Sequence, residues 1–120
     1  MERVLGIGGA FFRARDPESL RAWYAEHLGL EDFGGVVVRA GEGDVTVWSI
    51  FPADTEYFGP VARQAMLNYR VSDLDAMLEQ LWAAGVEVEA DVQAEEVGRF
   101  GWATDPEGNR FELWEPRAAG

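Results

Sequence analysis

The residue of this chain best suited to chemistry is Glu112, a carboxylate in the middle of a strand-like segment near the C-terminus. The segment 110–116 alternates, so Phe111 and Leu113 point to one face of the predicted strand while Glu112 and Trp114 point to the other. A mid-strand carboxylate needs a partner, because burying an unpaired charge is costly. Arg13, Arg70 and Arg110 are the candidate partners for a structural ion pair.

Few other residues offer reactive groups. The chain has no cysteine, which excludes disulfides, thiolate metal sites and cysteine nucleophiles. The single histidine, His27, lies in the last turn of a predicted helix, where it is interpreted as a capping or packing residue, with a ligand or base as the alternative. Ser19, Ser49 and Ser72 lack the sequence context of a nucleophile, and one helical histidine is a poor member of a catalytic triad.

Composition excludes several classes of protein. The 120 residues suffice for one domain, residues 1–120, and 48% hydrophobic residues indicate a globular chain. A formal charge of −12 and scattered arginines argue against nucleic-acid binding. No apolar run approaches the roughly 18 residues of a membrane helix, and no signal peptide is evident, so we expect a cytoplasmic protein. The acidic surface indicates solubility or the attraction of a cationic ligand.

The first half of the chain predicts a strand, a helix and further strands. An apolar segment at 4–14 is followed by Asp16, an N-cap, and Pro17 at the first helical position, and Gly29 closes the helix. The apolar stripe of this helix is Leu20, Trp23, Tyr24 and Leu28. The β-like runs that follow are 36–38 and 45–51, separated by a turn at 41–44.

The second half repeats this plan. A strand at 66–71 leads into a helix capped by Ser72 or Asp73 and ended by Gly85. An extended segment at 86–92 follows, and the chain finishes in a hairpin whose turn is Asp105-Pro106-Glu107-Gly108-Asn109.

The register of the repeat can be checked along the chain. The helix-start aspartates Asp16 and Asp73 are 57 residues apart, and the helix-end glycines Gly29 and Gly85 are 56 apart. Each half therefore reads β-α-β-β-β, with one module at about 1–56 and the other at about 64–116. The fold class is α+β, and the two modules are expected to pair, because one helix cannot cover the sheet of its own module.

Three motifs carry a family resemblance. They are Asp16-Pro17, Trp23-Tyr24-x-x-x-Leu28-Gly29-Leu30 and Asp105-Pro106-x-Gly108-Asn109-x-x-Glu112-Leu113. With the duplication, they resemble the vicinal oxygen chelate superfamily, which includes glyoxalase I, extradiol dioxygenases, fosfomycin-resistance transferases and bleomycin-resistance proteins. The match covers nearly the whole chain and is specific for the fold rather than for the activity, because one fold hosts many chemistries.

The resemblance implies a half-open barrel with metal ligands on the strands that face its interior. The two histidine positions of metal-using relatives fall on Gly9 and Met66, and aligning Pro52 with Pro116 puts Trp48 at a third ligand position. Only the final ligand, Glu112, is retained.

A catalytic divalent metal normally needs three or more protein ligands, and a thioether is a weak ligand for such ions. We therefore expect no cofactor. A divalent metal held by Glu112 with Asn68 is the alternative, although hard cations want six or more oxygens.

Strand alternation places aromatic and polar side chains on the interior face, as in a small-molecule pocket. Phe100 is expected to join them, and Tyr57 is a candidate hydrogen-bond donor, whereas Tyr69 points to the opposite face. The predicted ligand-binding residues are Phe11, Arg13, Trp48, Met66, Asn68, Arg70, Trp102, Glu112 and Trp114.

Two functions from different classes follow. The first is a metal-free small-molecule-binding protein that sequesters a planar aromatic or cationic compound, in the manner of the bleomycin-resistance branch; the resemblance then implies a homodimer. The second is a glyoxalase-like lyase, isomerase or dioxygenase with a non-standard metal site. Glu112 favours the enzyme, whereas Gly9, Met66 and Trp48 oppose it. Because only one metal-ligand position is retained, the sequence favours the metal-free binding protein over the enzyme.

Overall fold

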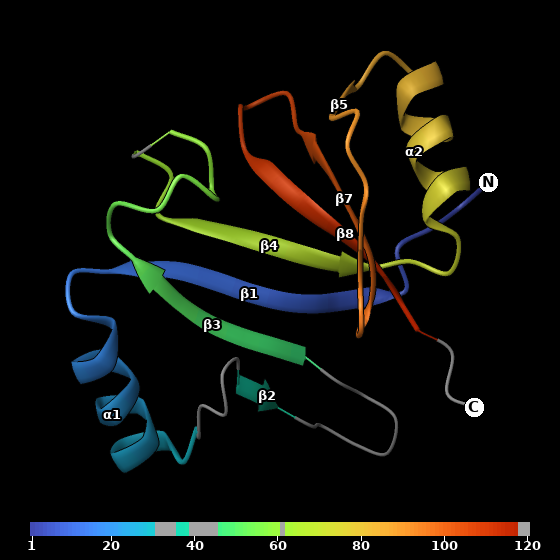
Figure 1. The fold of residues 1–120 in the computed structure, drawn as a ribbon. Helices are drawn as coiled ribbons and strands as arrows, with labels where there is room; N and C mark the ends of the chain where they lie inside the picture. Colours follow the sequence, from blue (N-terminus) through green and yellow to red (C-terminus); the bar gives the residue numbers. More distant parts are fainter. Residues whose placement is uncertain (31–35, 39–45, 61, 118–120) are drawn as a thin grey trace.

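The computed structural model describes residues 1–30, 36–38, 46–60 and 62–117. Their strands form one open, eight-stranded mixed sheet in the order β2-β3-β1-β4-β8-β7-β5, with β6 paired to β7 (Figure 1). The strands are β1 (Gly6–Ala14), β2 (Val36–Val38), β3 (Thr46–Pro52), β4 (Ala65–Arg70), β5 (Glu87–Val88), β6 (Gln93–Glu95), β7 (Gly98–Thr104) and β8 (Arg110–Pro116). The helices are α1 (Pro17–Leu28) and α2 (Leu74–Ala83).

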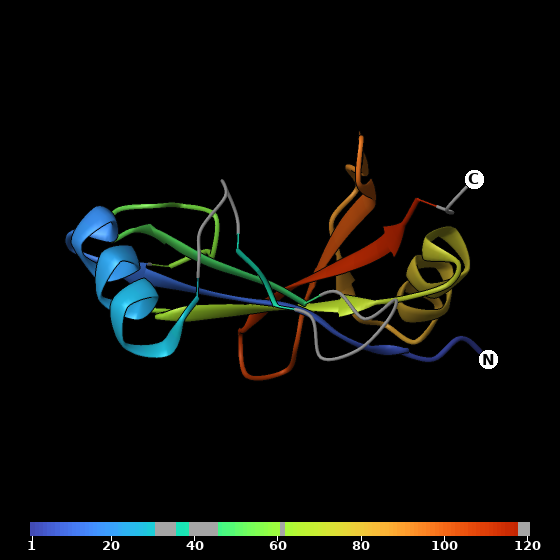
Figure 2. The same ribbon diagram turned by 90° about the horizontal axis from the view of Figure 1, so that it is seen from below.

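The two halves of the chain meet at the centre of the sheet. β1 and β4, the first strands of the two halves, run side by side and antiparallel, and each is parallel to the last strand of its own half, β3 or β8. The helices lie at opposite ends of the molecule (Figure 1). In Figure 2, β7 and β8 rise out of the plane in which β1, β3 and β4 lie. This arrangement confirms the predicted α+β fold with an open sheet.

Both helices begin at the predicted aspartates. Asp16 caps α1 by accepting a hydrogen bond from the backbone N–H of Ser19 at 3.1 Å, and Gly29 ends the helix with φ of 70°. Of the two candidate caps of α2, Asp73 takes the role and accepts from the N–H of Ala76 at 3.0 Å. These caps satisfy backbone donors that no helical carbonyl can reach, and they fix where each helix starts.

The two helices differ in how deeply they pack. From α2, Leu74 and Met77 are buried in a core cluster with Val71 and Leu113. No residue of α1 is buried. The helix predicted from the apolar stripe is confirmed, but the stripe is only partly covered. Leu20 and Tyr24 are half-buried, and the Tyr24 ring packs on the sheet. Trp23 is 50% exposed and Leu28 is 61% exposed.

Local predictions in the second half are largely confirmed. The carboxylate of Asp105 accepts from the backbone N–H groups of Glu107 and Asn109, each at 2.9 Å, and Gly108 has φ of 85°. Of the extended segment 86–92, only Glu87–Val88 forms a strand. The turn predicted at 41–44 lies outside the described residues. Neither described helix is long and apolar enough to cross a membrane.

Candidate functional site

Strand register gathers three predicted site residues into one row. Asn68 of β4 pairs with Glu112 of β8, and Glu112 pairs with Trp102 of β7, so the three side chains share one face of the sheet. In the next row Arg70 pairs with Trp114, and Trp114 pairs with Phe100. We call this surface the Glu112 face.

The Glu112 carboxylate is held by three donors of its own chain. Asn68 Nδ2 donates to Oε1 at 2.6 Å, Trp102 Nε1 donates to Oε2 at 3.0 Å, and the hydroxyl of Tyr57 donates to the same Oε2. Glu112 is only 3% exposed. Its partners are thus neutral donors, and the expected ion pair with an arginine is wrong.

The electrostatics of the cluster follow from burial. Removal from water raises the pKa of Glu112, although its three hydrogen bonds and the nearby Arg110 act in the opposite direction. The pKa of Tyr57 is also raised, first by burial and then by the negative charge of Glu112. The hydroxyl therefore keeps its proton and remains a donor to the carboxylate.

The guanidinium of Arg110 covers the cluster without contacting Glu112 directly. It forms a two-point ion pair with Glu89, with donor–acceptor distances of 2.7 and 2.8 Å. Its central carbon lies 5.3 Å from the ring centroid of Tyr57 and 5.1 Å from that of Trp102. The two rings that donate to Glu112 thus present their faces to a cation.

Tyr57 reaches the site from the loop between β3 and β4, and Arg13 fixes that loop. The Arg13 side chain is buried and donates to the backbone carbonyls of the loop. These carbonyls belong to Ala53 (3.0 Å), Thr55, Gly59 (3.4 Å), Pro60 (3.2 Å) and Arg63 (2.7 Å). Arg13, predicted to contact ligand, instead holds the loop that delivers Tyr57.

The same loop covers the first-half part of the interior face. Phe58 is fully buried and packs with the predicted site residues Phe11 and Met66. Neither side chain is therefore open to a ligand in this conformation. The adjacent aromatics at 57 and 58, within an otherwise turn-like segment, were the sequence signal for this contact.

Trp114 and Arg70 lie together at the other end of the face. Trp114 stacks on Phe100, with ring centroids 6.1 Å apart and planes 5° apart, and its Nε1 donates to the carbonyl of Val97 at 3.0 Å. Arg70 donates to the carbonyl of Ile7 at 3.1 Å. Gly8 makes room for this group, because a Cβ there would clash with Asn68 Oδ1 and touch Arg70 and Trp114.

Trp48 lies on the opposite face from the one predicted. Its ring packs on Phe12 and on Tyr24 of α1, with centroids 5.4 and 4.8 Å apart. The alignment of Pro52 with Pro116 caused the error. Strand pairing shows which residue is equivalent to Glu112. Phe11 and Asn68 lie at the same distance before the capping aspartates Asp16 and Asp73. Phe11 pairs with Ser49 and Asn68 pairs with Glu112, so Ser49 is the counterpart of Glu112.

His27, in the last turn of α1, is exposed. Its ring is 4.8 Å from that of Trp23, and its Nε2 is 3.8 Å from Glu26. These contacts, away from Glu112, agree with a packing residue.

The residues present do not fit a divalent metal. Among the described residues, no three His, Cys, Asp or Glu side chains cluster. The oxygens of Glu112 are taken by donors, Asn68 turns its N–H toward them, and Met66 packs among aromatic rings. Hydrogen-bond donors around a carboxylate compete with a cation for the same lone pairs.

Comparison with known proteins assigns the family. The model of the Glyoxalase-like domain matches residues 9–114. The chain belongs to this family. Membership agrees with the vicinal oxygen chelate resemblance, since the matched residues span both modules and end at Trp114 of β8. No curated protein matches this glyoxalase-like chain by sequence.

Solved structures share the fold at low identity. Methylmalonyl-CoA epimerase from Mycobacterium tuberculosis is 22% identical with a TM-score of 0.71, covering 96% of this chain and 90% of its own. A variant of methylmalonyl-CoA epimerase from Streptomyces coelicolor is 14% identical with a TM-score of 0.76, and the match covers 97% of this chain and 100% of that chain. The Mn(II)-bound glyoxalase from Novosphingobium aromaticivorans is 20% identical with a TM-score of 0.64, and the match covers 100% of this chain and 44% of that chain. At these identities the likeness shows the fold alone.

Proposed function

We propose that this glyoxalase-like protein binds a planar aromatic or cationic small molecule without a divalent metal, at the Glu112 face. The observation that carries the proposal is the occupation of Glu112 by donors from its own chain. Tyr57, Asn68 and Trp102 satisfy the one carboxylate at a family ligand position. A ligand at this face then contacts aromatic rings rather than a metal.

The aromatic side chains around Glu112 support a flat or positively charged ligand. Phe100 and Trp114 form a parallel pair, and Phe100 is half-buried, which leaves part of a ring for stacking. Tyr57 and Trp102 already accept the Arg110 guanidinium over their faces. The net charge of −12 adds a long-range attraction for cations.

A direct test uses proflavine, a planar aromatic cation, with binding followed by its fluorescence anisotropy. We expect saturable binding that is unchanged by EDTA. Trp114→Ala and Phe100→Ala should each weaken binding by about 1–3 kcal/mol. The matched control is Trp82→Ala, which removes an indole that is 68% exposed on α2. Binding that requires added Mn²⁺, or that is equally weakened by the control, would contradict the proposal.

The runner-up function is a metal-dependent lyase, isomerase or dioxygenase. It is favoured by the position of Glu112 and by the raised pKa of that carboxyl, which suits proton transfer. It is opposed by the donor set around the carboxylate. Stoichiometric Mn²⁺ or Zn²⁺ binding that Glu112→Gln abolishes would select it.

Two further properties are proposed from the family resemblance and the composition. We propose a homodimer, as implied for the bleomycin-resistance branch, and light scattering of the purified protein tests it. A cytoplasmic location is consistent with a chain of 120 residues that contains no cysteine. Fractionation of expressing cells tests that location.

A further inference from the structure

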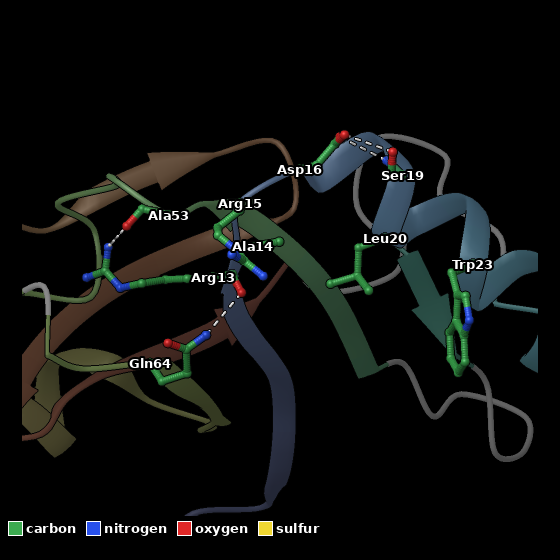
Figure 3. Close-up of a pocket in the computed structure, with 9 residues that line it drawn as sticks. All are labelled: Arg13, Ala14, Arg15, Asp16, Ser19, Leu20, Trp23, Ala53 and Gln64. Atoms are coloured by element: carbon green, nitrogen blue, oxygen red, sulfur yellow. Dashed lines mark hydrogen bonds between the residues drawn. The ribbon is translucent and has the colours of Figure 1, made fainter.

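A hollow lies away from the Glu112 face, where β1 ends and α1 begins (Figure 3). Its volume is about 700 Å³, within the range of small-molecule sites. Its walls come from the end of β1, the first turns of α1 and the loop between β3 and β4. None of the three side chains that donate to Glu112 is among its lining residues.

One wall of the hollow is apolar. Leu20 and Trp23 extend from α1 on the same side, toward the connection between β1 and α1 that carries Arg15 (Figure 3). Trp23 contacts Tyr24 edge to face, with centroids 5.0 Å apart, and remains 50% exposed. A half-exposed indole next to an aliphatic side chain offers a platform for a flat ring.

The polar groups of the hollow differ in whether they are already engaged. Asp16 accepts from the backbone N–H and the hydroxyl of Ser19, at 3.1 and 2.8 Å, so its oxygens serve the helix cap. Arg13 is committed to the loop carbonyls. The exposed Arg15 forms no hydrogen bond or ion pair with any residue that the structure describes. Its guanidinium is therefore the charged group available to a ligand.

The charge of this lining contrasts with that of the whole protein. The lining carries one cation that the protein does not already engage, Arg15, next to the Asp16 carboxylate, in a chain whose formal charge is −12. An anion repelled by most of the surface is accepted more readily here, because nearby charges act more strongly than distant ones screened by salt.

We propose that this hollow is a second ligand site, for a small aromatic carboxylate. The flat ring lies against Trp23 and Leu20, and the carboxylate pairs with the Arg15 guanidinium. This ligand class is opposite in charge to the one proposed for the Glu112 face, and neither Arg15 nor Trp23 takes part in the contacts of that face.

The test uses naphthalene-2-carboxylate as the probe, with naphthalen-2-ylmethylammonium as its cationic match. Binding is measured by calorimetry and by the NMR shift of the Trp23 indole N–H. We expect saturable binding of the carboxylate that Arg15→Gln and Trp23→Ala each weaken at least tenfold. Both side chains are exposed, so these variants keep the fold, which urea unfolding verifies.

Two control variants separate this site from general effects and from the Glu112 face. Arg117→Gln and Trp82→Ala remove an exposed arginine and an exposed tryptophan elsewhere, and neither should change the affinity by more than twofold. Phe100→Ala, which weakens proflavine binding, should leave the naphthoate affinity unchanged. No saturable shift of the Trp23 signal, equal loss in the controls, or tighter binding of the ammonium compound would overturn the proposal.

Discussion

The two halves of this protein share strand pairing but carry different side chains at equivalent positions. Phe11 and Asn68 stand at the same distance before the capping aspartates, and their strand partners are Ser49 and Glu112. The first pair lies where the loop packs Phe58 against Phe11, whereas the second forms the polar cluster. Duplication thus supplies the scaffold, and among the described residues the buried carboxylate lies in the second half.

The arginines show the same division. Arg13 and Arg70 both lie three residues before a capping aspartate, Asp16 or Asp73. Arg13 is buried and holds five loop carbonyls, whereas Arg70 is half-buried and donates to Ile7. The first half therefore positions a loop over the face, and the second half supplies the carboxylate that the loop meets.

The sharpest test of the comparison removes the two equivalent side chains. Glu112→Ala leaves three donors in the cluster without an acceptor, and we expect a loss of about 3 kcal/mol or more in the free energy of unfolding. Ser49→Ala should cost less than about 1 kcal/mol. Urea unfolding measures both. Equal losses would show that the two positions are energetically alike and would break the comparison.

The next largest difference in stability is expected between variants of the two equivalent arginines, Arg13 and Arg70. Arg13→Met keeps an unbranched chain but removes the donors to the loop, so we expect the free energy of unfolding to fall by about 2–3 kcal/mol and amide hydrogen exchange to become faster at residues 53–59. Arg70→Met should cost about 1 kcal/mol and leave exchange in that loop unchanged. Protection of the loop that survives Arg13→Met would contradict the role assigned to Arg13.

A smaller difference in stability is expected between equivalent substitutions in the two helices. Met77 of α2 is buried, while its counterpart Leu20 in α1 is half-buried. We expect Met77→Ala to cost about 2–3 kcal/mol and Leu20→Ala about 1 kcal/mol in unfolding free energy. If Leu20→Ala proved the more costly, α1 would be the better-packed helix, contrary to this account.

The smallest expected effect is a pH dependence that belongs to Glu112. Because burial raises its pKa, the folded protein holds this proton to higher pH than the unfolded chain does. The resulting stabilisation is complete below the ordinary glutamate pKa and is lost as the pH rises through the folded-state pKa. The stability of the wild type relative to Glu112→Gln should therefore fall over that window and then level off.

Thermal unfolding of both proteins from pH 4 upward measures this difference. Asp16, Asp75, Glu89 and Asp105, whose pKa values are lowered, contribute the opposite slope, but they are common to both proteins and cancel. A relative stability that rises with pH would contradict the raised pKa.

Much of this arrangement was predictable because local signals fix it. Asp16 and Asp73 cap helices through contacts three residues along the chain, and the alternation of β8 sets the face of Glu112. The donation from Trp102 follows once β7 and β8 pair as a hairpin.

The failures share a different cause, since they depend on contacts between distant segments. The phase of Trp48 is set by pairing of β3 with β1, which the proline alignment misjudged by one residue. The commitment of Arg13 to the loop, and of Arg110 to Glu89, depends on which of several cations lies nearest in space. Composition and spacing name such partners without choosing among them.

The most direct test of the central claim is metal binding at Glu112. Protein freed of metal by chelation is dialysed against Mn²⁺ and, separately, Zn²⁺, and bound metal is quantified beside the Glu112→Gln variant. The account predicts no saturable one-to-one site in either protein, because Tyr57, Asn68 and Trp102 already occupy the carboxylate. Stoichiometric binding to the wild type that disappears in Glu112→Gln would contradict it.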